Sequence, residues 1–72
     1  MTEVAKEAAR LRAKFNAERI NLEDISYWIG YDRKTVERKI SHLPYFDDGG
    51  KRYEVTVIAE YIVAHTKKGG ST

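Results

Sequence analysis

The sequence has no cysteine, a single proline and no long apolar run. Without cysteine, neither a disulfide nor a thiolate metal site can stabilise the fold. No stretch approaches the roughly 18 apolar residues of a membrane-spanning helix, and no secretory h-region follows Met1. Because the lack of cysteine suits a reducing compartment, we expect a cytoplasmic protein.

Sequence signatures of catalysis, metal binding and cofactor binding are missing as well. No nucleophile has a base near it, and the only glycine pair before the C-terminus, in residues 47–50 (Asp-Asp-Gly-Gly), is too short and acidic for a phosphate loop. His42 and His65 have no carboxylate or cysteine neighbours at ligand spacing. We therefore expect a protein that is not an enzyme and that uses no cofactor and no metal.

The residues that are present indicate one small folded domain. A chain of 72 residues forms a single domain that buries only about 60% of the surface of its unfolded state. Five Tyr, two Phe and one Trp suit such a domain better than a disordered basic tail. The net charge of +2 is too small to imply a nucleic-acid partner by itself. The positions of the charges therefore matter more than their sum.

Residues 2–20 have the pattern of an amphipathic helix. Thr2 is a suitable N-cap, and apolar residues recur at steps of four, three and four, as on one helical stripe: Val4, Ala8, Leu11 and Phe15. The basic residues lie off that stripe: Lys6, Arg10, Arg12 and Lys14. We expect these basic side chains to be solvated, with contact to phosphate as the alternative.

Two short helices follow and meet at a glycine. Asn21 is the predicted N-cap of the first, and Gly30 its predicted C-terminal stop. Asp32 is the predicted N-cap of the second, which runs from residue 33 to about 42 and ends before Pro44. The predicted buried stripes are Leu22, Ile25 and Ile29 on the first helix, and Val36, Ile40 and Leu43 on the second.

The remainder of the chain predicts a hairpin and a last helix. Tyr45 and Phe46 begin an extended segment, residues 47–50 form a turn, and residues 51–53 return as the partner strand. The last helix is predicted to start near Thr56. Its predicted buried side consists of Val57, Ile58, Tyr61, Ile62 and His65. Residues 67–72 are predicted to form a flexible tail.

The two helices around Gly30 have the pattern of a helix-turn-helix, whose second helix reads the major groove of DNA. Ser26 is small enough for a close helix crossing, Gly30 makes the bend, and Tyr31 is expected to fill the corner. On the second helix, the side opposite the apolar stripe is polar: Lys34, Thr35, Arg38, Ser41 and His42. The sequence thus predicts a mainly α fold with a small β-hairpin, namely a winged helix-turn-helix over residues 21–66 after a helix over residues 1–20.

The predicted recognition helix supplies most of the candidate DNA contacts. Because the major groove admits one α-helix, the outward residues of this helix would reach base edges or the groove lip: Lys34, Thr35, Arg38 and His42. Arg38 is the best candidate for a bidentate contact with guanine, worth about 1–3 kcal/mol of discrimination. Arg33 and Lys39, on the flanks, are expected to hold phosphates.

Several other residues have two interpretations each. Glu37 is expected to pair with Arg33 at i, i+4, with acceptance from a cytosine amino group as the alternative. Lys51 and Arg52 would contact the DNA backbone from the wing or reach into the adjacent minor groove, or else they only solvate an edge strand. We expect the acidic tip of the wing, residues 47–48, to stay off the DNA. Tyr27 is a candidate phosphate contact, whereas Trp28 is expected in the core.

The order of these features resembles a known superfamily. A helix-turn-helix is followed by Pro-Tyr-Phe, a glycine turn, Lys-Arg-Tyr-Glu and a short apolar helix, from Asn21 to about Ala64. This order is similar to the winged-helix domain of phage excisionases (recombination directionality factors), of phage terminase small subunits and of MerR-type regulators. On that pattern the recognition helix carries Arg33, Lys34, Thr35 and Arg38, and the wing carries Lys51 and Arg52.

The resemblance implies an architectural role without chemistry. Excisionases bind repeated sites cooperatively, bend attachment-site DNA and direct a phage integrase toward excision, and they are often this short. The implied partners are double-stranded DNA, further copies of the chain along the DNA, and an integrase. One alternative is a small transcription regulator or the DNA-binding domain of a terminase small subunit. An alternative of another class is a protein-interaction module whose apolar helix stripe binds a partner.

Overall fold

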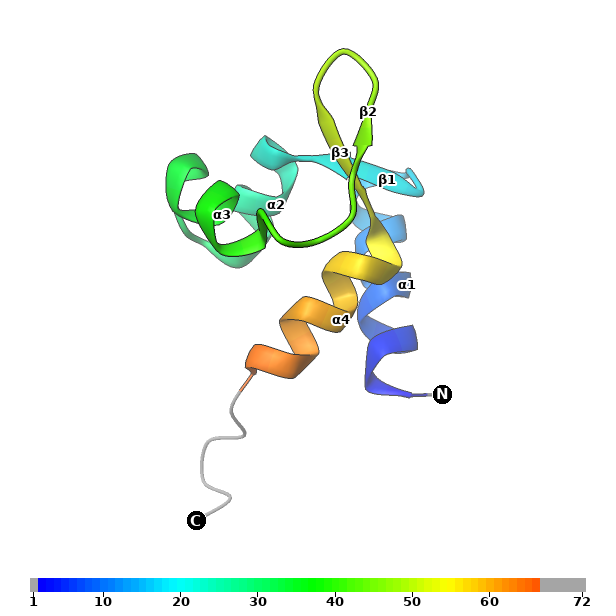
Figure 1. Cartoon of the computed structure of the whole chain (residues 1–72). Coiled ribbons are helices and arrows are strands. Elements are labelled where there is room, and N and C mark those ends of the chain that lie inside the picture. The colour runs from blue at the N-terminus through cyan, green and yellow to red at the C-terminus, as the bar shows by residue number, and fades with distance from the viewer. Residues whose placement is uncertain (1, 67–72) are drawn as a thin grey trace.

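The computed structural model describes residues 2–66, so the predicted tail at residues 67–72 lies outside the described residues. The elements, in chain order, are α1 (Glu3–Phe15), β1 (Arg19–Asn21), α2 (Leu22–Ile29), α3 (Arg33–Ile40), β2 (Phe46–Asp47), β3 (Lys51–Glu54) and α4 (Val55–His65). The described chain is therefore mainly helical with a small antiparallel sheet. Helices α1 and α4 pack against each other below the sheet, α2 and α3 lie to one side, and the β2–β3 hairpin projects at the top (Figure 1).

Helix α1 is shorter than predicted. Thr2 is its N-cap, as expected, since its side chain accepts a hydrogen bond from the Ala5 N–H at 3.0 Å. The helix ends at Phe15 because Asn16 adopts the left-handed conformation (φ 52°) and donates its N–H to the Arg12 carbonyl at 2.7 Å. The predicted helix through Ile20 is therefore wrong. Ile20 is almost fully buried in a strand instead, where a β-branched side chain packs well.

The sheet contains a strand that the sequence pattern did not predict. The strand order is β1-β3-β2, with Ile20 paired to Tyr53 and Phe46 paired to Arg52. The predicted hairpin is confirmed as β2–β3. Strand β3 lies in the centre of the sheet, so the interpretation of Lys51 and Arg52 as residues of an edge strand is wrong.

The predicted N-caps and the glycine stop between α2 and α3 are confirmed. Asn21 accepts a hydrogen bond from the Asp24 N–H at 2.8 Å, and Asp32 accepts one from the Thr35 N–H at 3.3 Å. Gly30 ends α2 with a φ of 93°, which a residue without Cβ adopts without strain. Tyr31, however, does not fill the corner, because its side chain is 54% exposed.

The core forms where the helix stripes meet the inner face of the sheet. Its buried residues are Ala8, Leu11, Ile20, Leu22, Ile25, Val36, Ile40, Tyr53, Val55, Ile58 and Ala59. On α4 the buried stripe runs 55, 58, 59, because this face packs against α1. Val57, Tyr61 and Ile62 are only half-buried, and the predicted burial of His65 is wrong, since it is exposed.

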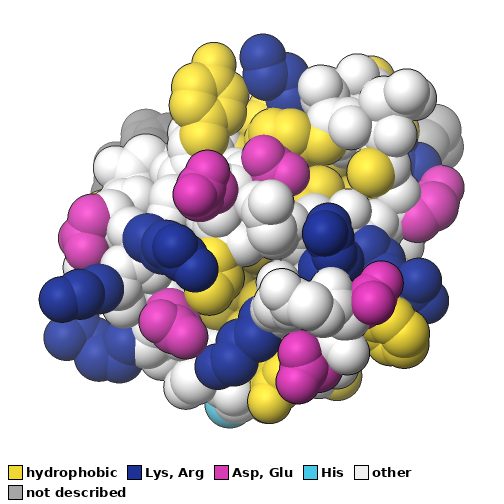
Figure 2. All heavy atoms as spheres, turned by 90° about the horizontal axis from the view of Figure 1, so that it is seen from above, with side chains coloured by type: hydrophobic (Ala, Val, Ile, Leu, Met, Phe, Trp, Pro, Cys, Tyr) yellow, Lys and Arg dark blue, Asp and Glu magenta, His cyan; other side chains and the backbone are white. Residues whose placement is uncertain are grey.

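The surface carries charges of both signs. Seen from above, Lys and Arg side chains are interleaved with Asp and Glu side chains, and apolar side chains are exposed between them (Figure 2). The large exposed hydrophobic residues are Tyr27, Tyr31, Tyr45 and Phe46. None of the helices within residues 2–66 has the length and apolar character needed to cross a membrane.

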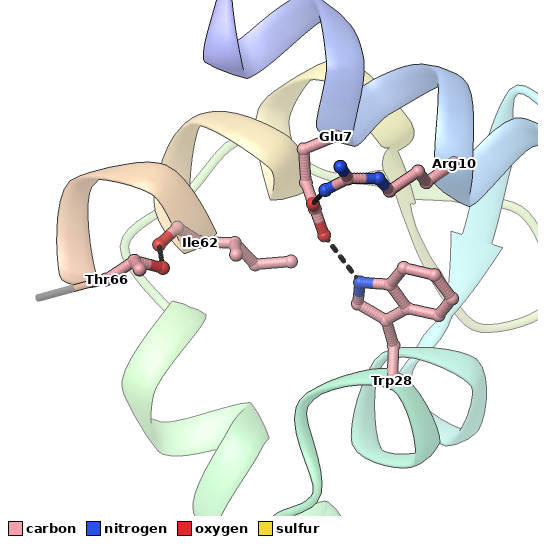
Figure 3. A network of polar contacts seen from close by, with 5 residues as sticks. All are labelled: Glu7, Arg10, Trp28, Ile62 and Thr66. Carbon is pink, nitrogen blue, oxygen red and sulfur yellow. Dashed lines mark hydrogen bonds and ion pairs between the residues drawn. The ribbon is translucent and has the colours of Figure 1, made fainter. Parts of the chain in front are cut away.

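A polar contact joins α1 to α2. The Trp28 Nε1–H donates a hydrogen bond to Glu7 Oε2 at 2.7 Å, and Glu7 also pairs with Arg10 at 3.2 Å (Figure 3). The Trp28 ring packs edge-on against Phe15, with ring centroids 6.0 Å apart. Trp28 is therefore a structural residue, as expected, and it attaches α1 to the helix pair.

We expect Glu7→Ala to lower the free energy of unfolding by about 1.5–3 kcal/mol, the usual contribution of a partly buried hydrogen bond to a charged group. The Glu7 side chain is only 12% exposed, so its loss would leave the indole N–H without an acceptor. Urea denaturation measures the change. The control is Glu60→Ala, an exposed position on α4, which should change stability by no more than about 0.5 kcal/mol. Equal effects of the two variants would contradict this interpretation.

Candidate nucleic-acid interface

Helix α3 exposes a basic crest. Val36 and Ile40 are buried, and at 100° per residue Lys34 and Arg38 lie on the opposite side of the helix. Both side chains are exposed, as are those of Arg33 and Lys39 on the two flanks. The part of α3 predicted to face DNA is therefore open to solvent.

The two flanks of α3 face different neighbours. On one flank, Glu37 Oε2 accepts a hydrogen bond from Lys51 Nζ of the hairpin at 3.4 Å. On the other flank, Lys39 Nζ lies 5.6 Å from the ring centroid of Tyr31. Lys39 and Tyr31 also line a hollow together with His65 of α4. The crest of α3 thus lies between the hairpin on one side and the end of α4 on the other.

The contact of Glu37 differs from the prediction. Glu37 pairs with Lys51 rather than with Arg33, because the fold brings β3 alongside this flank of α3. The hydrogen bond that Lys51 donates to Glu37, reinforced by the negative charge of Glu37, raises the pKa of Lys51 above its usual value. Lys51 therefore stays charged at neutral pH, but part of its charge is already compensated by Glu37.

Thr35 has a structural task within α3. Its hydroxyl donates a hydrogen bond to Asp32 Oδ1 at 2.5 Å, and its N–H donates to Asp32 Oδ2. Both hydrogen bonds lower the pKa of Asp32, and the bond from the Thr35 hydroxyl has the larger effect. The capping contribution is therefore present above the unfolded-state pKa of Asp32 and is lost as the pH falls through the lower folded-state value. The predicted contact of Thr35 with a base edge would have to compete with this cap.

The hairpin carries basic and acidic residues next to one another. Arg52 is exposed, whereas Lys51 is half-buried and its Nζ lies 5.1 Å from the Tyr45 ring centroid. Asp47 and Asp48 at the tip are exposed. Lys51 is paired with Glu37, whereas Arg52 makes no ion pair among the described residues, so Arg52 is the cation of the hairpin that is open to a ligand.

Two predicted site residues lie away from the crest of α3. Tyr27 is 69% exposed and lies next to α1, where Lys14 Nζ is 5.2 Å from its ring centroid. His42 is exposed but follows the end of α3 at Ile40, so the predicted extension of the helix to residue 42 is wrong. A turn closed by the bond from the Leu43 N–H to the Ile40 carbonyl replaces it.

The sequence pattern missed one exposed cation beside the hairpin. Arg19 belongs to β1, and its guanidinium carbon lies 4.6 Å from the ring centroid of Phe46. Arg19 and Phe46 share a shallow hollow with Arg52 on the outer face of the sheet. Only the pairing of β1 with β3 reveals this neighbourhood, because the sequence pattern had placed Arg19 in a helix.

Comparisons of the chain with protein-family models, with curated proteins and with solved structures give no match. Function therefore has to be inferred from the arrangement of the chain's own side chains. The most prominent arrangement is the exposed crest of α3, with Lys34 and Arg38 at its centre and the hairpin beside it.

Proposed function

We propose that the chain is a small, non-catalytic DNA-binding protein with a winged helix-turn-helix fold. In this proposal α3 is the recognition helix and the β2–β3 hairpin is the wing. The observation that carries it is the exposed basic crest of α3, on which Lys34 and Arg38 face solvent. The one acid of that helix, Glu37, is paired with Lys51. A single helix of this kind fits the major groove, whose walls are phosphates.

The positions around the helix suggest how the contacts divide. Arg38 and Lys34 would reach base edges, with Arg38 as the bidentate partner of a guanine. Arg33 and Lys39 lie on opposite flanks and would hold phosphates of opposite groove walls. Arg52 would add a backbone contact from the wing, whereas Lys51 contributes mainly by holding the hairpin against α3.

Within this class of protein, an excisionase is the function we favour. One protomer has few cations on its proposed interface, so a single copy would bind weakly. Several copies on adjacent sites would supply the missing affinity, because each bound neighbour raises the effective concentration of the next. The resulting bend in the attachment site would direct an integrase toward excision. The protein would act on DNA in the cytoplasm of a bacterial host.

Binding to duplex DNA should therefore be measurable and strongly dependent on salt. With two to four phosphates contacted per protomer, affinity should fall roughly 10- to 150-fold between about 50 and 200 mM salt. Fluorescence anisotropy with a labelled random duplex measures this dependence. If no binding occurs even at the lowest salt, DNA binding is excluded and the protein-interaction module remains.

Footprinting on candidate target DNA then separates the DNA-binding roles. An excisionase should protect tandem, head-to-tail sites in an attachment region and change their curvature. A protected palindrome within a promoter would instead support the transcription regulator. An integrase gene next to the gene for this chain would support the excisionase.

A further inference from the structure

A hollow of about 230 Å³ opens where three elements meet. They are the start of α2, the start of α3 and the second half of the hairpin loop. The residues that line it are Asn21, Leu22, Glu23, Arg33, Gly49, Gly50, Lys51 and Arg52. The hollow lies on the Arg33 flank of α3, on the side where Glu37 holds the hairpin.

The lining of this hollow suits an anion. Arg33 and Arg52 are both exposed, and Lys51 is paired with Glu37. Glu23 is the one carboxylate in the lining, so the positive charge of the two guanidinium groups exceeds the negative charge there.

The hairpin also leaves room for a ligand at this point. Gly49 and Gly50 line the hollow with backbone only, while the acidic residues of the tip precede them. A Cβ built on either glycine would meet no atom within 4 Å. Residues 47–50 are too short and acidic to form a phosphate loop alone, but the fold supplies the missing cations from α3 and β3.

We propose, on the basis of the proposed DNA-binding function, that this hollow holds one phosphate of the DNA backbone, shared by Arg33 and Arg52. The phosphate would be bound from α3 and from the hairpin at once. The bond between Glu37 and Lys51 keeps these two elements together before DNA arrives. One shared phosphate would then determine how far α3 enters the groove and where the wing lies on the same strand.

The test counts phosphates through the salt dependence of duplex binding. Each neutralised phosphate contributes about 0.9 to the slope of log K against log salt. Arg33→Ala and Arg52→Ala should each weaken binding several-fold. In the double variant the magnitude of the slope should decrease by only about 0.9, because both side chains bind one phosphate. Two separate phosphate contacts would decrease it by about 1.8.

The matched control is the pair Arg33→Ala and Lys39→Ala. These residues lie on opposite flanks of α3, so their double variant should lose about 1.8 of the slope. A loss of about 1.8 for the Arg33 and Arg52 pair, or an effect of only one of its single variants, would overturn the shared phosphate. DNA binding itself would stand in that case. If the wild-type chain fails to bind duplex, the proposed function is wrong and this inference falls with it.

A second readout separates DNA phosphate from free phosphate ion. In amide NMR spectra of the whole chain, duplex DNA should shift the signals of Gly49 and Gly50. Inorganic phosphate at a few millimolar, with ionic strength held constant, should leave them in place. An equal shift by the free ion would assign the hollow to a small phosphate ligand and overturn the proposal.

Discussion

Reversing two charges on the crest of α3, in the double variant Lys34→Glu/Arg38→Glu, should lower duplex affinity by at least about 100-fold. The loss of one bidentate base contact alone amounts to about 1–3 kcal/mol, and two new carboxylates facing the groove walls add repulsion. Both positions are exposed, so the fold should survive. The helix dipole also affects the two changes in opposite directions: the carboxylate in the first turn of α3 stabilises the helix, and the carboxylate in its last turn destabilises it.

The control for this experiment is Lys6→Glu/Lys14→Glu. Both residues are exposed on α1, and the variant has the same net charge as the first one. Anisotropy at a fixed low salt concentration compares the two variants, and circular dichroism verifies that each is folded. If both variants lose affinity equally, duplex affinity depends on the total charge of the chain and α3 is not the recognition helix. That result would also favour the alternative in which the bases of α1 touch phosphate.

Removing the ring of Tyr53 should destabilise the protein more than any surface change. Tyr53 is 0% exposed and lies in the central strand, opposite Ile20 of β1. Truncation of a buried aromatic residue to alanine costs about 3–5 kcal/mol, through lost burial and the cavity left behind. A domain of this size has a total stability of roughly 4–11 kcal/mol. Tyr53→Ala should therefore shift the urea midpoint far down, or leave the chain unfolded at 25 °C.

Tyr53→Phe is the matched comparison, and it should be neutral or slightly stabilising. The Tyr53 hydroxyl is buried and has no hydrogen-bond partner among the described residues. Burial raises the pKa of Tyr53, so the phenol stays neutral at ordinary pH. Removing an unsatisfied buried hydroxyl should increase stability by up to about 1 kcal/mol. A clear loss of stability in Tyr53→Phe would mean that the hydroxyl has a partner in solution.

Features that depend on neighbours within one or two turns of helix could be predicted from the residue order alone. The caps at Thr2, Asn21 and Asp32 and the stop at Gly30 all lie where their residue types predict. The burial of Val36 and Ile40 also follows from the periodicity of α3, whereas Leu43, predicted to continue the stripe, lies beyond the helix and is only partly buried. Such features can be predicted because each one depends on a hydrogen bond or a packing contact with a residue only three or four positions away.

The contacts between segments far apart in the sequence could be found only in the folded chain. Arg19 and Ile20 extend a helical pattern in the sequence, yet pairing with β3 makes them a strand. Glu37 has Arg33 four positions away, yet it bonds to Lys51, fourteen residues along the chain. Arg33 and Arg52 line one hollow only because the hairpin lies beside α3. Pairings of this kind depend on the position of β3 among its neighbours. That position is determined by the burial of Tyr53 and Ile20 in a common core. Contacts between residues so far apart in the sequence leave no trace in a local sequence pattern.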